Sequence, residues 1–213
     1  MSFMRNRERS NRIGLMVVFL SFFFYFLSLT SLALAAEPME VMKGTIDEVI
    51  RILKDPTLRE PRKKEERRVL LEKAIVGRFD FTEMAKRSLA AHWRERTPAE
   101  QKEFAELFGK LLESSYIGKI EAYTDEKVVY TNEILDGDFA EVKTKVVTKK
   151  VEIPIDYRLF KNGSDWKVYD VVIDGVSLVN NYRNQFNKVI RNSSYEELVK
   201  KMKAKEAEIS VAP

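Results

Sequence analysis

The 213-residue chain contains no cysteine and a single histidine, His92. Without cysteine it has no disulfide, no thiolate nucleophile and no thiolate metal ligand. One histidine also argues against zinc or a redox metal, because such sites are built mainly from histidine and cysteine side chains. We therefore expect no metal and no other cofactor, and a domain that is held together by its hydrophobic core alone.

The first 35 residues have the pattern of an export signal. Four arginines between residues 5 and 12 precede an apolar run from Ile13 to about Leu29, and Ala33-Leu34-Ala35 has the small-x-small pattern that signal peptidases cut. The alternative is an uncleaved anchor, because the apolar segment is long enough to cross a bilayer of about 30 Å. Both interpretations place residues 36–213, the predicted single domain, outside the cytoplasm, with a frayed tail from about residue 206.

Little net charge remains once this segment is set aside. Lys+Arg falls from 37 to 33 and Asp+Glu from 33 to 32, so the net charge falls from +4 to +1. Basic residues alternate with glutamate in runs such as "RKKEERR", which is typical of a solvated helix face. The chain lacks the one-sided basic excess of nucleic-acid-binding proteins, so we do not expect nucleic acid as a partner.

Residues 42–123 are predicted to form helices. Apolar residues recur at helical spacing from Met42 to Leu53, and a charged helix follows that Gly77 ends. Asp80 has the position of an N-cap for a short helix. Thr97 to Glu100 then combine a capping box with proline at the first helical position, which predicts the start of a long helix.

After Thr124 the hydrophobic period changes from about 3.6 to 2. Asp136-Gly137 and Asn162-Gly163 separate strand-like segments and predict two hairpins. Two helices follow from Leu178 onward. The predicted fold class is therefore α+β, in which N-terminal helices pack on a curled antiparallel sheet of about four strands, C-terminal helices follow, and an apolar cavity is enclosed. Periodicity alone does not distinguish a filled core from a hollow one.

The corner Gly175-Val176-Ser177 resembles part of a nucleophile elbow. The elbow needs glycine two residues after the serine, but Val179 occupies that position, and no histidine base is close in sequence. We interpret Gly175 as a turn residue and Ser177 as a helix N-cap. Asp170 remains a candidate general base for a small non-metal enzyme in a cone-shaped fold; the simpler interpretation pairs it with a neighbouring cation or hydroxyl. We favour a protein that is not an enzyme.

Three segments carry a family resemblance. "FDFTEMAKRSLAAHW", "TPAEQKEFAELFGKLLESSYIGKIEAY" and "WKVYDVVIDGVSLVNNYRNQFNKVI" together resemble the MlaC, or toluene-tolerance, family of periplasmic phospholipid carriers. The resemblance covers about Met42 to Lys205. One departure is Ala90, where we expect glycine in many relatives. The resemblance implies a carrier that shuttles phospholipid between an outer-membrane lipoprotein complex and an inner-membrane ABC transporter with a membrane-anchored substrate-binding subunit.

The alternation in the sheet segments then suggests which side chains line the lipid pocket. The predicted sheet wall comprises Val142, Val146, Ile153, Ile155, Tyr157, Leu159 and Val168, and the predicted helical lid comprises Leu107, Leu111 and Leu112. Arg183, Asn184 and Asn187 form a candidate docking surface for a membrane complex, although a merely solvated helix face would show the same pattern. The cargo could also be another lipid such as a hopanoid, and a tethered interaction module without a cavity remains an alternative.

Overall fold

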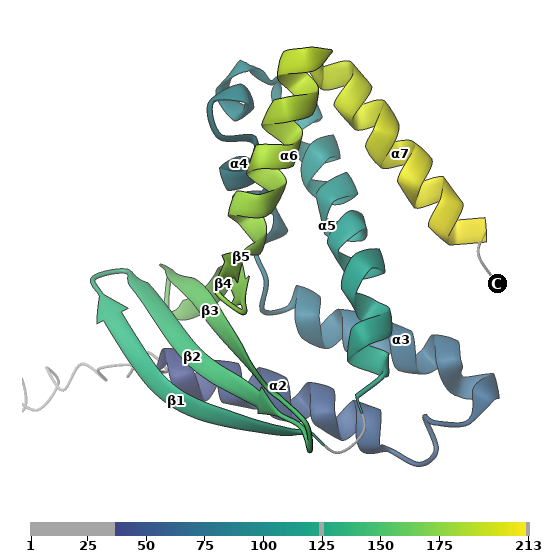
Figure 1. Ribbon diagram of the computed structural model, residues 1–213, viewed down its shortest axis with the longest axis vertical. Helices are drawn as coiled ribbons and strands as arrows, with labels where there is room; N and C mark the ends of the chain where they lie inside the picture. The colour runs from purple at the N-terminus through teal and green to yellow at the C-terminus, as the bar shows by residue number, and fades with distance from the viewer. Residues whose placement is uncertain (1–36, 124–125, 212–213) are drawn as a thin grey trace, which may run out of the picture. The chain divides into compact units, whose positions relative to one another are not determined.

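A curled antiparallel sheet lies between two groups of helices in the computed structural model (Figure 1). The structure describes residues 37–123 and 126–211, and the predicted signal peptide lies outside these ranges. The strands are β1 Lys127–Asp136, β2 Phe139–Val147, β3 Glu152–Asn162, β4 Asp165–Ile173 and β5 Val176–Ser177. Their spatial order follows the chain, so each strand pairs with the next by a short connection.

Turn residues with positive φ make these connections possible. Gly137 (φ 58°) and Gly163 (φ 64°) occupy the tips of the two predicted hairpins, where a Cβ atom would be strained. A third turn at Asp174 (φ 49°) and Gly175 (φ 78°) returns the chain against β4. This turn produces the two-residue strand β5, so the sheet has five strands where the sequence indicates about four and a corner.

Helices account for most of the remaining described residues. They are α2 Pro38–Lys54, α3 Lys64–Val76, α4 Phe81–Leu89, α5 Pro98–Glu121, α6 Leu178–Asn192 and α7 Tyr195–Val211, with 3₁₀ turns η1 Pro61–Lys63 and η2 Ala90–Glu95. The predicted caps are present: Asp80 accepts from the Glu83 amide, Ser177 accepts from the Asn180 amide, and Thr97 forms the full capping box. Helix α7 continues to Val211, into the predicted tail.

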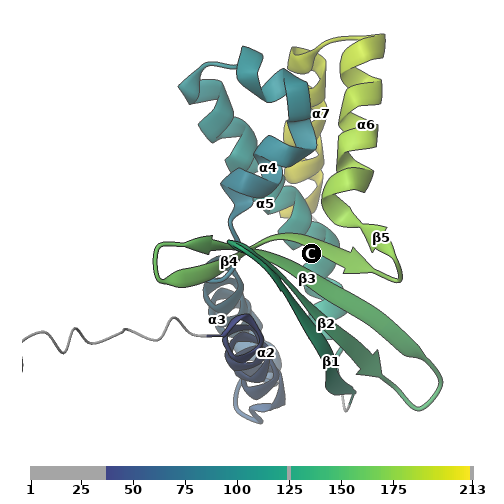
Figure 2. The ribbon, with the colours of Figure 1, turned by 90° about the vertical axis from the view of Figure 1, so that its left-hand side faces the viewer.

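The helices form two groups around the sheet. Figure 2 shows α4, α6 and α7 on one side of the sheet and α2 and α3 on the other. The long helix α5 joins the groups, because Phe104 and Phe108 near its start pack with α4, α6 and α7, whereas Ile117 near its end packs with α2 and α3. None of the helices within the described ranges is long and apolar enough to cross a bilayer.

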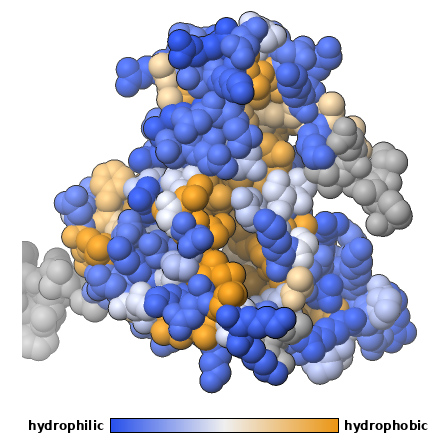
Figure 3. All heavy atoms as spheres, in the orientation of Figure 1, coloured by the Kyte–Doolittle hydropathy of each residue, from blue (hydrophilic) through white to orange (hydrophobic). Residues whose placement is uncertain are grey.

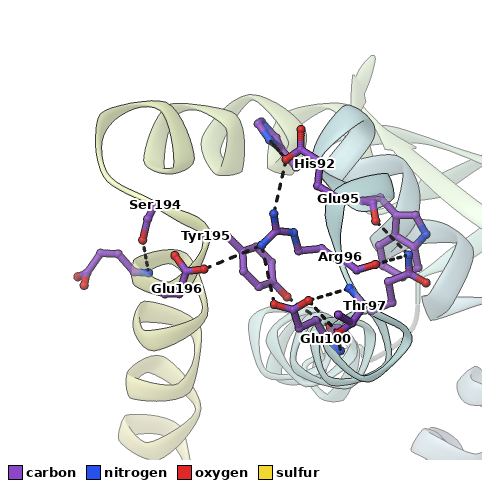
Figure 4. A network of polar contacts seen from close by, with 11 residues as sticks. His92, Glu95, Arg96, Thr97, Glu100, Ser194, Tyr195 and Glu196 are labelled. Carbon is purple, nitrogen blue, oxygen red and sulfur yellow. Dashed lines mark hydrogen bonds and ion pairs between the residues drawn. The ribbon is translucent and has the colours of Figure 1, made fainter.

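A polar network fastens the start of α7 to the start of α5 (Figure 4). The Arg96 guanidinium lies 4.6 Å from the centre of the Tyr195 ring and 3.9 Å from a carboxylate oxygen of Glu196. It also lies 3.8 Å from Glu100, whose backbone carbonyl accepts a hydrogen bond of 3.3 Å from the Tyr195 hydroxyl. Hydrogen bonds from Thr97 lower the pKa of Glu100, which keeps this carboxylate charged opposite Arg96.

Candidate functional site

The inner face of the sheet, defined here as the face that carries Val142, Tyr157, Leu159 and Val168, borders a hollow. Figure 3 shows hydrophobic residues around a recess between the sheet, α2 and the end of α5. Several side chains that pack against the buried cluster of this face are themselves only partly buried: Ile46, Phe79, Tyr116, Tyr130, Ile155, Tyr157 and Ile173. Side chains in a filled core interdigitate and lose their accessible surface, whereas these side chains keep part of theirs.

The exposure of the predicted sheet-wall residues rises from one end of the wall to the other. Val142, Leu159 and Val168 are fully buried and pack together against α2. Ile155 and Tyr157 are half-buried members of the same cluster. Along β3 the exposure then rises to 36% at Ile153, and Val146, which pairs with Ile153, is half-buried. The structure therefore brings five of these seven residues into one cluster and places the other two toward the more exposed end.

The predicted lid residues lie in a different cluster. Leu107 and Leu112 are buried, and Leu111 is half-buried, among side chains of α4, α6 and α7. The part of α5 that faces the sheet is one turn farther along, where Tyr116 packs against both clusters. Helical periodicity identifies the buried stripe of α5 but not the element that each residue meets, and this is why the sequence prediction missed Tyr116.

Helix α2 supplies the other helical wall of the hollow. Met42 is fully buried against the sheet cluster, and Ile46 packs beside it one turn later. The Glu133 carboxylate on β1 accepts a hydrogen bond of 2.6 Å from the Met39 amide at the start of α2, which fixes the helix against the sheet. The apolar stripe from Met42 to Leu53 was the sequence signal for this wall, although the sequence did not show that it faces the sheet.

Three tyrosines belong to the cluster on this inner face. Burial raises the pKa of Tyr157 to about 12 and also raises the pKa of Tyr116. Burial, with the nearby carboxylates of Asp47 and Glu40, raises the pKa of Tyr130 as well. All three phenols therefore remain neutral at physiological pH, and the wall of the hollow formed by these residues carries no charge.

The predicted docking residues lie on the opposite side of the sheet, beside an open cleft of about 600 Å³. Arg183 and Asn184 line this cleft, together with Arg87 and Tyr169. The Arg183 Nε atom donates a hydrogen bond of 3.0 Å to the Arg87 carbonyl, and the Arg87 guanidinium stacks 3.9 Å from the centre of the Tyr169 ring. The cleft is thus polar and rich in arginine.

Asn187 does not line this cleft. Its side-chain oxygen lies 3.2 Å from Nε2 of His92, so the only histidine of the chain contacts α6 at this point. The structure therefore places the three predicted docking residues on one helix but brings only Arg183 and Asn184 to the cleft.

Asp170 joins β4 to the start of α6. The residue is 3% exposed, and its carboxylate accepts hydrogen bonds from the Ser177 hydroxyl at 2.6 Å and the Val179 amide at 3.0 Å. Arg158 on β3 completes the arrangement with an ion pair of 3.3 Å. Both carboxylate oxygens thus bind protein donors, which matches the simpler interpretation of Asp170. No group of three or more potential metal-ligating carboxylate, histidine or cysteine residues occurs in the described part of the chain.

These features define a class: an α+β fold whose curled sheet and helices surround an apolar hollow. The family described as "MlaC protein" matches residues 43–204. The chain therefore belongs to the MlaC family, as its sequence motifs indicate.

Known proteins of this kind align with parts of the chain. It is 26% identical over 127 residues to the "Intermembrane phospholipid transport system binding protein MlaC" of Haemophilus influenzae, covering 56% of this chain and 59% of the relative. It is 30% identical over 95 residues to the "Toluene tolerance protein ttg2D" of Pseudomonas putida, covering 44% of each chain. The alignments thus span about half the length of these curated relatives.

A solved structure shares the fold over a longer stretch. The phospholipid-binding protein from Ralstonia solanacearum, determined in complex with a phospholipid, superposes with a TM-score of 0.72 and is 28% identical. The match covers 82% of this chain and 99% of that protein. The α+β architecture predicted from the sequence is therefore confirmed.

Proposed function

We propose that this chain is a periplasmic lipid carrier that holds the acyl chains of a phospholipid in the hollow behind the sheet. The observation that carries the proposal is the recess with hydrophobic residues around it in Figure 3, together with the partly buried apolar side chains of the inner face. The relative from Ralstonia solanacearum, which was solved with a bound phospholipid, supports this choice of ligand. A hopanoid or another lipid is the second candidate, because apolar walls select for apolar chains and not for one headgroup.

Energetics require that the lipid chains be enclosed. Two acyl chains of about 15 methylenes each, at about 0.8 kcal/mol per buried CH₂, would cost on the order of 24 kcal/mol if left in water. A surface patch leaves much of this area wet, whereas a hollow bordered by a sheet and helices shields it. The proposed carrier therefore needs an interior space, and a filled core would not serve.

We assign the lining of the hollow as follows. The sheet wall combines the half-buried Ile155 and Tyr157 with the fully buried Val142, Leu159 and Val168 behind them, and Val146 and Ile153 extend it to its more exposed end. Tyr116 of α5 and Ile46 of α2 form the helical walls. Leu107, Leu111 and Leu112 support Tyr116 from within the helical cluster, because Leu112 precedes it by four residues on the same face of α5.

The carrier would exchange its cargo with an outer-membrane lipoprotein complex and an inner-membrane ABC transporter, and so maintain the lipid asymmetry of the outer membrane. The membership in the MlaC family supports this role. Residues 1–35 would act as the export signal; the intact mass of the exported protein distinguishes cleavage after Ala35 from retention as an anchor. The arginine-rich cleft beside Arg183 and Asn184, with Asn187 on the same helix, is the proposed docking surface for a membrane complex.

Native mass spectrometry of the purified mature protein tests the carrier proposal. We expect the protein to retain lipid that can be extracted into organic solvent. Ile155→Trp should fill the hollow and reduce the retained lipid without lowering the melting temperature. Ile134→Trp, at a 45% exposed position of β1, is the matched control and should leave lipid retention unchanged.

Two results would contradict the proposal. One is a wild-type protein that carries no extractable lipid. The other is an Ile155→Trp variant that is destabilised by about 1–3 kcal/mol, which is the usual cost of overpacking a filled core.

A second experiment addresses docking. Arg183→Glu reverses a charge at the cleft, and we expect it to weaken binding to the membrane-anchored subunit of the transporter in a pull-down with purified components. Arg191→Glu makes the same change at an exposed position near the end of α6 and is the control. Equal binding by both variants and the wild type would remove the docking assignment while leaving the lipid-binding proposal intact.

A further inference from the structure

Two tyrosines of the inner-face cluster, Tyr130 and Tyr157, carry hydroxyls that make no hydrogen bond within the part of the chain that the structure describes. The Tyr130 hydroxyl oxygen is buried and makes no hydrogen bond. Tyr157 is half-buried in the same cluster, and its hydroxyl has no hydrogen-bond partner among the described residues. A buried donor that gives up water without gaining an acceptor costs free energy, so the unpaired hydroxyl of Tyr130 requires an explanation.

The sheet register places the two tyrosines on the two strands that pair with β2, at nearby positions of β2. Tyr130 on β1 pairs with Thr144 on β2, and Tyr157 on β3 pairs with Val142, two residues from Thr144 on the same strand. The two tyrosines thus flank β2 from either side, and both belong to the cluster that borders the hollow. Thr144 lies opposite Tyr130, and its hydroxyl donates to the Ile155 carbonyl at 2.6 Å; the Tyr130 hydroxyl does not donate to it.

The surrounding charges indicate which kind of acceptor fits. The charged groups that act on Tyr130 are the carboxylates of Asp47 and Glu40 on α2, and both disfavour further negative charge. A phosphate would therefore be repelled at this position. A neutral acceptor such as an ester carbonyl oxygen would not, and it can accept a hydrogen bond from each of two donors.

We propose that Tyr130 and Tyr157 donate hydrogen bonds to ester carbonyl oxygens of a bound diacyl lipid, which fixes how deeply the lipid enters the hollow and selects ester-linked lipids over ether-linked ones. This inference rests on the proposed carrier function. In this arrangement the two tyrosines contact the ester groups next to the glycerol of the lipid, and the charged headgroup lies away from them.

The test is a competition between two lipids that differ only in the carbonyl. Delipidated mature protein is incubated with an equimolar mixture of a diester phospholipid and the diether phospholipid of the same headgroup and chain length, and native mass spectrometry gives the ratio bound. We expect the wild type to favour the diester lipid by about five- to tenfold, which corresponds to about one net hydrogen bond. Tyr130→Phe and Tyr157→Phe should each lower this preference, and the double variant should bring it close to one.

The controls separate this inference from the carrier proposal. Tyr195→Phe removes a tyrosine hydroxyl at the distant network of Figure 4 and should keep the preference of the wild type. A wild type without preference, or a preference that survives in the double variant, would overturn the tyrosine assignment even though lipid is bound. Failure of the wild type to bind either lipid would overturn both proposals. Each Phe variant removes one oxygen only, and circular dichroism verifies that it is folded.

Discussion

Replacement of Asp170 by alanine tests the join between the sheet and α6. The change removes an acceptor from three donors: the Ser177 hydroxyl, the Val179 amide and the Arg158 guanidinium. Val179 is 3% exposed, so water does not readily replace the lost acceptor of its amide. An unsatisfied buried donor costs about 1–3 kcal/mol. The lost ion pair with Arg158 adds less to the cost, because the Arg158 side chain is 40% exposed and keeps its ion pair with Glu141 at 3.2 Å.

Together these costs predict that Asp170→Ala lowers the free energy of unfolding by about 3 kcal/mol. In a domain of this size about 1 kcal/mol shifts the melting temperature by roughly 2–4 °C, so we expect a decrease of about 6–12 °C. Asp170→Asn keeps one carbonyl oxygen as an acceptor, so the free energy of unfolding should fall by only about half as much as in Asp170→Ala. Chemical denaturation monitored by circular dichroism measures the free energy, and a thermal melt measures the shift.

Asp138→Ala is the control, because Asp138 is an exposed aspartate in the turn between β1 and β2 and its replacement should change stability by less than about 0.5 kcal/mol. Equal melting temperatures for Asp170→Ala and Asp138→Ala would show that the hydrogen bonds of Asp170 do not stabilise the join. An enzymatic turnover that disappears in Asp170→Asn at unchanged stability would instead favour the alternative in which Asp170 is a general base.

Three further predictions concern local features. Ala90 has φ 51° and ψ −118°, a conformation that favours glycine, so Ala90→Gly should stabilise the protein by about 1 kcal/mol in a denaturant titration, whereas Ala91→Gly should destabilise it. Thr97→Ala removes the capping box of α5 and should cost about 1 kcal/mol by the same measurement; no loss would show that the cap is dispensable. Burial raises the pKa of Tyr157 and of Tyr195 to about 12, above the ordinary value of about 10. Each neutral phenol therefore contributes to the free energy of unfolding in full below pH 10, and this contribution is lost as the pH rises from 10 to 12. Between pH 10 and 12 the melting temperature of Tyr157→Phe should fall less steeply with pH than that of the wild type. The same slope for both proteins would contradict the raised pKa of Tyr157.

Local signals in the sequence predicted most of the fold. The Asp136-Gly137 and Asn162-Gly163 pairs marked the hairpins, because few residues other than glycine adopt positive φ without strain. The expected glycine at position 90 of the family pattern also has a physical basis here, since Ala90 itself has positive φ. Strand β5 was not predicted, because two residues are too short to show alternation.

The residues of the candidate site were harder to predict from the sequence. Alternation along β3 placed Ile155, Tyr157 and Leu159 on one face, and the structure brings all three into the sheet cluster. Helical periodicity suggested Leu107, Leu111 and Leu112 as a lid, and the structure places all three among side chains of α4, α6 and α7. A periodic stripe shows which face of a helix is buried, but the partner of that face depends on contacts between residues far apart in the chain.

The sequence by itself determined the caps, the turns and the change from helical to strand periodicity, because each depends on interactions between residues a few positions apart. Only the tertiary structure decided that the sheet cluster is hollow. The volume left behind the sheet depends on how closely α2 and the end of α5 approach it, and no pattern along the chain encodes that separation. Within the described residues, the same tertiary arrangement left the buried hydroxyl of Tyr130 without an acceptor.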